Sequence, residues 1–116
     1  MTGAEAEKVA EDYLVKEKNH QVLERNFKVY EGEIDIISQD RDILVFIEVK
    51  YLKNSWQYDP EEQVHSSKQK KLFKAAQAYL QLKKYSGECR FDVLSINGEN
   101  GKLEFAHFVD ALEFNS

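Results

Sequence analysis

The sequence predicts an α+β fold in which two helices cover one β-sheet. Apolar residues recur at helical spacing in two separate segments. Other segments are rich in β-branched and aromatic residues and are typical of strands. The 116 residues are 42% hydrophobic, which is enough to build the core of a single domain over residues 1–116. We therefore expect the order helix, three strands, helix, two strands, with both helices packed on the sheet.

The first half of the chain supplies one helix and three strands. The helix is expected over residues 3–18, where apolar side chains recur three or four positions apart. Strands are expected over residues 21–30, 32–38 and 42–52, and a polar turn falls around residues 39–42. Because the joints between these strands are short, we expect an antiparallel meander.

The second half supplies a helix and two strands. The helix is expected from Pro60 to about Lys84, since Pro60 suits a first helical turn. Strands follow over residues 89–96 and 102–109, and the NGENG segment between them predicts a turn. The buried stripe of the helix is expected to consist of Leu72, Phe73, Ala75, Ala76, Tyr79 and Leu80.

Charge is unevenly distributed along the chain. The net charge of −5 argues against a protein that binds nucleic acid over its whole surface. Residues 50–84, however, carry eight lysines against three acids. This basic segment is suited either to contacting phosphates or to forming a solvated helix face.

Other classes are excluded by simple counts. No apolar run approaches the ~20 residues of a membrane span, and the N-terminus is acidic where a secretory signal would be basic. We therefore expect a cytoplasmic protein without a membrane partner. Cys89 is the single cysteine, which excludes an intrachain disulfide and a metal site built from cysteines. Asp92, an acid inside a strand, is expected to pair with a basic neighbour.

The segment GEIDIISQDRDILVFIEVK, residues 32–50, places three charged residues in two apolar strands. Residues two apart share a face of a strand, so Glu48 and Lys50 point the same way. Both faces of their strand are apolar, which predicts a central strand covered on both sides. A loop of two or four residues would place Asp35 on the face of Glu48, opposite it or one pair away. An odd loop or a bulge would place Asp35 on the other face.

Two carboxylates this close repel each other unless a cation neutralises them. Oxygen ligands with open positions for water and phosphate suit Mg²⁺ or Mn²⁺ and not zinc. Lys50 can help to orient or deprotonate an attacking water and can offset charge on a phosphate. Glu7 lies along the buried side of the first helix and can reach the same place. Asp35, Glu48 and Lys50 on one hairpin are therefore suited to hydrolysing a phosphodiester, and the position of Glu7 supports this interpretation.

A structural interpretation stands beside the catalytic one. An acid and a lysine two residues apart on a strand are commonly a surface ion pair worth about 0 to 1 kcal/mol. In that case Asp35, Glu48 and Lys50 form a stabilising ion network, and replacing Asp35 lowers the melting temperature without any metal.

Five segments cover nearly the whole chain in this order: AEKVAEDYL, VLERNFKVYEGEIDII, LVFIEVKY, HSSKQKKLFKAAQAYL and RFDVLSI. Together they resemble the YraN-like family of predicted endonucleases. That family belongs to the PD-(D/E)xK nuclease superfamily and is related to archaeal Holliday junction resolvases. The resemblance implies a restriction-endonuclease-like core, a mixed five-stranded sheet with helices packed on it in the order αβββαββ.

The resemblance also implies roles for single residues. It makes Asp35, Glu48 and Glu7 metal ligands and Lys50 the catalytic lysine, with Mg²⁺ or Mn²⁺ as the cofactor. The nucleic-acid contacts that it implies lie on the second helix, at Lys68, Gln69 and Lys71. The chain departs from the family pattern at Ala6, where the family usually has Gly, and at Leu52, where it usually has Arg.

The expected function is therefore that of a metal-dependent endonuclease with water as the nucleophile. Structured or branched DNA is the expected substrate and is favoured over RNA. The alternative is a non-catalytic module that binds nucleic acid or takes part in an assembly and keeps the nuclease fold. Related resolvases work as dimers, which makes a homodimer a candidate assembly, although no feature of this sequence identifies a dimer face.

Overall fold

A computed structural model describes residues 2–52, 66–99 and 102–114 of the chain. The predicted α+β class and the element order αβββαββ are confirmed. The predicted beginning of the second helix at Pro60 lies outside the described residues. The elements are α1 (Gly3–Lys18), β1 (Gln21–Val29), β2 (Gly32–Asp40), β3 (Ile43–Leu52), α3 (Ser66–Lys83), β4 (Cys89–Glu99) and β5 (Lys102–Leu112).

The five strands form one mixed sheet in the order β1-β2-β3-β4-β5. β3 and β4 run parallel and the other neighbours run antiparallel, so the predicted meander of the first three strands is confirmed. The turn between β2 and β3 consists of two residues, Arg41 and Asp42, and Arg41 has a left-handed φ of 56°. The joint is therefore one of the even-numbered loops that the sequence argument required.

β4 and β5 are longer than the sequence predicted. Asn97 and Gly98, which were expected to begin a turn, instead pair with Glu104 and Leu103 inside the β4–β5 ladder. Gly98 has a φ of 127°, a conformation that glycine adopts without steric cost. The glycine therefore lets the strand continue through the point at which the composition predicted its end.

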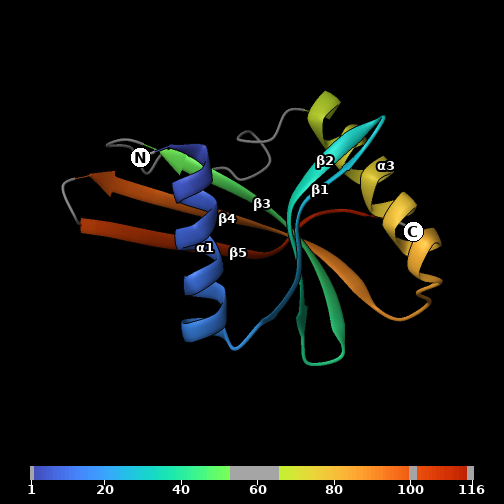
Figure 1. Cartoon of the computed structure of the whole chain (residues 1–116), viewed down its shortest axis with the longest axis horizontal. Helices are drawn as coiled ribbons and strands as arrows, with labels where there is room; N and C mark the ends of the chain where they lie inside the picture. The colour runs from blue at the N-terminus through green and yellow to red at the C-terminus, as the bar shows by residue number, and fades with distance from the viewer. Residues whose placement is uncertain (1, 53–65, 100–101, 115–116) are drawn as a thin grey trace.

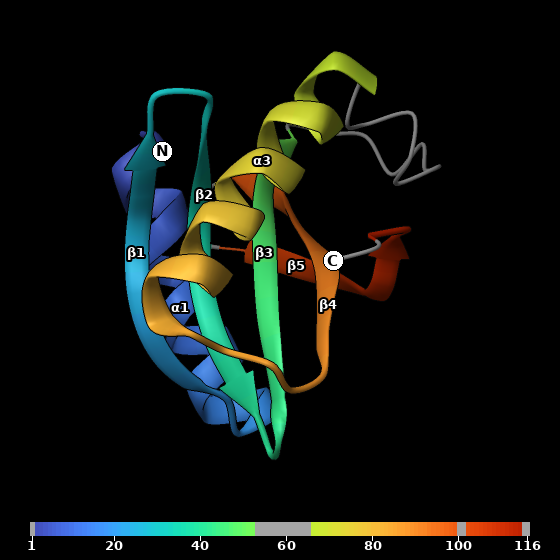
Figure 2. The ribbon, with the colours of Figure 1, turned by 90° about the vertical axis from the view of Figure 1, so that its right-hand side faces the viewer.

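The two helices cover opposite faces of the sheet. In Figure 2, α3 crosses the near face of the sheet while α1 lies behind it. Neither helix of the described residues is long and apolar enough to cross a membrane. Figure 1 shows β4 and β5 extending together to one side of α1, beyond the part of the sheet that α3 covers.

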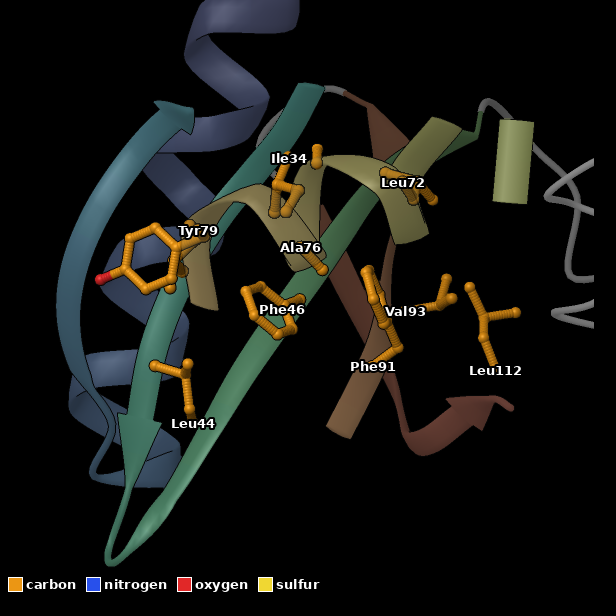
Figure 3. Close-up of a cluster of buried hydrophobic side chains, with 11 residues drawn as sticks. Ile34, Leu44, Phe46, Leu72, Ala76, Tyr79, Phe91, Val93 and Leu112 are labelled. Carbon is orange, nitrogen blue, oxygen red and sulfur yellow. The ribbon is translucent and has the colours of Figure 1, made fainter. Parts of the chain in front are cut away.

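Each helix has its own apolar cluster beneath it. Under α3, Leu72, Ala76 and Tyr79 pack on Phe46 and Ile34, as Figure 3 shows. Under α1, a second cluster consists of Ala6, Ala10, Leu14, Ile36, Val45, Ile47, Leu94 and Ile96. β3 contributes alternate residues to the two clusters, so the prediction of a central strand covered on both faces is confirmed.

The first helix is fixed at both ends by local hydrogen bonds. The Thr2 hydroxyl accepts from the backbone N–H of Glu5, and the Glu5 carboxylate accepts from the backbone N–H of Thr2. At the other end Asn19 adopts a left-handed φ of 57° and its N–H donates to the Leu14 carbonyl. These caps satisfy end groups that the helix itself leaves unpaired.

Candidate functional site

β2 and β3 separate at the position of Asp35. Their pairing runs from Asp40↔Ile43 to Ile36↔Ile47, and the same register would place Asp35 opposite Glu48. The backbone N–H of Val49 donates instead to the Asp35 carboxylate at 2.9 Å. Figure 2 shows the two strands diverging toward the end of α3 at which that helix begins. At this point the Asp35 side chain, and not a backbone carbonyl of β2, accepts the hydrogen bond from the β3 backbone.

The regular alternation that the sequence argument assumed does not hold at Asp35. Ile34 packs in the cluster under α3 and Ile36 in the cluster under α1, although residues two apart in a regular strand share a face. Asn26, the β1 residue between the partners of Ile34 and Ile36, has a left-handed φ of 52°. β2 is therefore irregular around Asp35, and the charge of Asp35 still acts on Glu48.

Glu48 is the most deeply buried acid of the site, with 3% of its surface exposed. Burial, and after it the charge of Asp35, raises the pKa of Glu48 to about 6. Lys68 of α3 places its Nζ 2.6 Å from Glu48 Oε1, and Lys50 places its Nζ 3.9 Å from the same oxygen. The site thus joins two acids and two lysines from three elements.

Asp35 and Glu7 also have raised pKa values. For Asp35 the main cause is burial, and the hydrogen bond from the Val49 N–H opposes it only in part. For Glu7 burial comes first and the charge of Asp35 second, while a hydrogen bond with Asn26 works in the other direction. Asp35 and Asn26 are thus among the neighbours that act on the pKa of Glu7.

The two lysines differ in character. Burial, followed by the charge of Lys68, lowers the pKa of Lys50, which makes it a better proton acceptor than an exposed lysine. Burial is the largest influence on Lys68 as well and acts to lower its pKa, but the hydrogen bond and charge of Glu48, with the contributions of Lys50 and Asp35, together raise that pKa. Lys68 therefore keeps its positive charge to a higher pH than Lys50 does.

The other predicted residues of α3 lie along the same helix. Gln69 is partly buried and has an interaction partner, while Lys71 is exposed. A Cβ at Gly32 would come within 2.3 Å of the Lys71 carbonyl oxygen, so the β1–β2 hairpin touches the helix backbone there. Ala6 is buried against the sheet, and the side chain of Leu52 lies outside the described residues.

The donor set suits a cation that keeps much of its water. Within the described part of the chain, no three His, Cys, Asp or Glu side chains are grouped closely enough to form a ready-made metal site. Mg²⁺ needs fewer protein ligands, because it is commonly held by one or two carboxylates and several waters. Asp35 and Glu48 could supply those two carboxylates, and the role of Glu7 as a third metal ligand stays a prediction.

A second buried acid, Asp92, has a structural environment. Its carboxylate accepts from Arg90 Nε at 2.9 Å and lies 2.7 Å from His107 Nε2. It also accepts from the N–H of Asp110, which has a left-handed φ of 54° at the irregularity of the β4–β5 ladder. The prediction that Asp92 pairs with basic neighbours is confirmed, and we assign it to holding β5.

The contact between Lys68 and Glu48 is the feature that sequence reasoning missed. Lys68 was expected near the phosphates of a substrate, and four lysines between positions 68 and 74 are hard to rank by charge alone. One signal would have singled it out. Lys68 lies one turn before Leu72 and two before Ala76, in line with the buried stripe of α3.

Comparison with known proteins places the chain in a family. The model of the uncharacterised protein family UPF0102 matches residues 6–96. A UPF0102 protein of Thermodesulfovibrio yellowstonii is 44% identical over 82% of this chain and 84% of its own length. Another, of Clostridium botulinum strain Eklund 17B, is 43% identical over 94% of this chain and 91% of its own. One of Dictyoglomus thermophilum is 38% identical over 96% and 99%. The chain therefore belongs to the uncharacterised protein family UPF0102.

Proposed function

We propose that this protein is a metal-dependent endonuclease that hydrolyses a phosphodiester bond of nucleic acid. The observation that carries the proposal is the pair Asp35 and Glu48 at the split between β2 and β3. Both acids have a raised pKa because they are buried, and Asp35 further raises that of Glu48. A fold rarely keeps two mutually repelling buried acids unless they bind a cation or take part in chemistry.

Each residue has a task in such a reaction. A divalent cation held by Asp35 and Glu48 would polarise a phosphate oxygen and lower the pKa of a bound water. Lys50, whose own pKa is lowered, would orient the attacking water or accept its proton. Lys68 would supply positive charge for a phosphate, and Glu7 would be an additional acid at the metal site, as the resemblance implies.

Structured or branched DNA is the substrate that we propose, because the resemblance is to resolvase-like nucleases. The basic face needed for a phosphate backbone is present on α3, where Lys70, Lys71 and Lys74 are exposed. The net charge of −5 argues against such binding over the whole surface.

Cleavage assays test the proposal directly. Purified protein with Mg²⁺ or Mn²⁺ is expected to nick plasmid, flapped or four-way-junction DNA, and chelation with EDTA is expected to stop it. Asp35→Asn, Glu48→Gln and Lys50→Met should each reduce the rate by a factor of about 100 or more, the loss typical of removing a group that acts on the transition state. Glu88→Gln, a change of an exposed acid, is the matched control and should cleave normally. Cleavage that survives all three site variants would refute the assignment.

A non-catalytic nucleic-acid-binding module is the second candidate. The 2.6 Å ion pair between Lys68 and Glu48 favours it, since the acid already has a counter-ion. This module would bind DNA with strong salt dependence through the α3 lysines and would be indifferent to Asp35→Asn. Binding without cleavage of any of these DNA forms, with or without metal, would decide for it.

A further inference from the structure

Two lysines lie near the buried Glu48 carboxylate, one from a strand and the other from a helix. Lys50 extends from β3, the central strand, and its side chain is 23% exposed. Lys68 extends from the first turn of α3, and its side chain is 45% exposed. The shorter contact is made by the more exposed lysine, at 2.6 Å against 3.9 Å. Lys68 can therefore leave Glu48 for solvent without any movement of the sheet.

The Glu48 oxygen that Lys68 contacts is also one that a divalent cation would use. An ammonium at 2.6 Å and a metal ion on this carboxylate would repel each other, so the binding of one weakens the binding of the other. The flexible four-carbon stem of lysine lets the charge move while the backbone stays in place. The contact between Gly32 and the Lys71 carbonyl keeps α3 against the hairpin as this happens.

We propose that Lys68 is a resident counter-ion of the site, which neutralises Glu48 in the metal-free protein and is displaced when a divalent cation binds. Once displaced, its ammonium is free to contact a phosphate of the nucleic acid. This inference rests on the proposed function and adds a positioning role for Lys68. Metal binding and nucleic-acid binding are then coupled, since each favours the state in which Lys68 has left Glu48.

Metal affinity gives the first test, and it needs no nucleic acid. We would titrate Mn²⁺ into the full chain by calorimetry for wild type, Lys68→Met and Lys68→Gln, after confirming by circular dichroism in EDTA that each is folded. Removing the competing charge is expected to tighten Mn²⁺ binding roughly three- to tenfold, the effect of one partly exposed charged hydrogen bond. Lys16→Met, which removes an exposed lysine of α1, should bind Mn²⁺ as wild type does.

A purely structural lysine would give the opposite result. If Lys68 only held Glu48 in place, its loss would weaken Mn²⁺ binding or leave it unchanged, and either result overturns the inference. Failure of the proposed function is distinguishable, because then neither wild type nor any variant binds Mn²⁺.

The coupling gives the second test. In a Lys50→Met background, which removes the catalytic lysine and keeps the acids, Mn²⁺ is expected to tighten binding of a fluorescent four-way junction, measured by anisotropy. Adding Lys68→Met should reduce this Mn²⁺-dependent gain by about threefold or more, since the released ammonium is no longer there to bind a phosphate. An undiminished gain would show that Lys68 does not link the two ligands.

Discussion

Replacing Glu48 with glutamine is expected to stabilise the metal-free protein at alkaline pH. Burial and the charge of Asp35 raise the pKa of Glu48 from an ordinary 4.5 to about 6. At 1.36 kcal/mol per pKa unit, ionising this acid costs the folded protein about 2 kcal/mol of its free energy of unfolding. Glutamine keeps the shape of the side chain and has no charge to bury. Lys68 loses its partner in this variant, but with its side chain 45% exposed it is readily hydrated.

The pH dependence follows from the direction of the shift. Because the pKa of Glu48 is higher in the folded state than in the unfolded state, the folded state binds the proton more tightly. The wild type therefore loses this stability as the pH rises from about 4.5 to 6, and the whole loss is present above that range. The advantage of Glu48→Gln should be near zero at pH 4 and about 2 kcal/mol at pH 8.

Urea or thermal denaturation in EDTA measures this difference. For a domain of this size about 2 kcal/mol corresponds to a rise in melting temperature of roughly 5 to 10 °C. Glu88→Gln, at an exposed position, should melt like wild type at both pH values. A lower melting temperature for Glu48→Gln at pH 8 would refute the reasoning. Glu48, Lys50 and Lys68 would then form a stabilising ion network, and the ionised Glu48 would not destabilise the metal-free protein.

Two further predictions concern the scaffold. Gly32→Ala should lower the free energy of unfolding by about 2 kcal/mol or more, because its Cβ would come within 2.3 Å of the Lys71 carbonyl oxygen and push the hairpin from α3; a urea melt equal to wild type would contradict it. Asp92→Ala should cost about 3 to 5 kcal/mol because Arg90 and His107 both lose this buried carboxylate, while Arg90 keeps its ion pair with Asp40. Burial acts to raise the pKa of Asp92, but the bonds from His107 and Arg90 outweigh it and lower that pKa, so this stability is present above the ordinary value near 3.8 and is lost as the pH falls through the lower folded pKa. Denaturation curves between pH 2 and 7 would show this loss, and no steeper decline than in Asp92→Ala would contradict it.

Much of the fold was predictable because it depends on local patterns. The spacing of apolar residues in α1 predicts a helix, and apolar residues on both faces of β3 predict a central strand. The structure has both. The two-residue loop at Arg41 and Asp42 is one of the even loops that the sequence allowed, although the sequence also left an odd loop open. The ends of β4 and β5 could not be predicted. Asn97 and Gly98 are residue types that usually mark a turn, but here they pair within the β4–β5 ladder.

The candidate site was predictable in its residues and less so in its geometry. Asp35, Glu48 and Lys50 could be grouped from strand periodicity once an even loop was assumed, and Glu7 from its place on the buried side of α1. The break in β2 at Asp35 could not, because it depends on a left-handed residue in the neighbouring strand, Asn26. The contacts of Lys68 depend on how α3 lies over the sheet, which the sequence does not state.

The binding of Mn²⁺ tests the central claim most directly. We predict that calorimetry of the wild-type chain shows saturable binding of Mn²⁺, and that Asp35→Asn, which keeps an acceptor for the Val49 N–H but removes the charge, abolishes it. Absence of binding in the wild type, or equal binding in Asp35→Asn, would contradict the account of these two acids as a metal site.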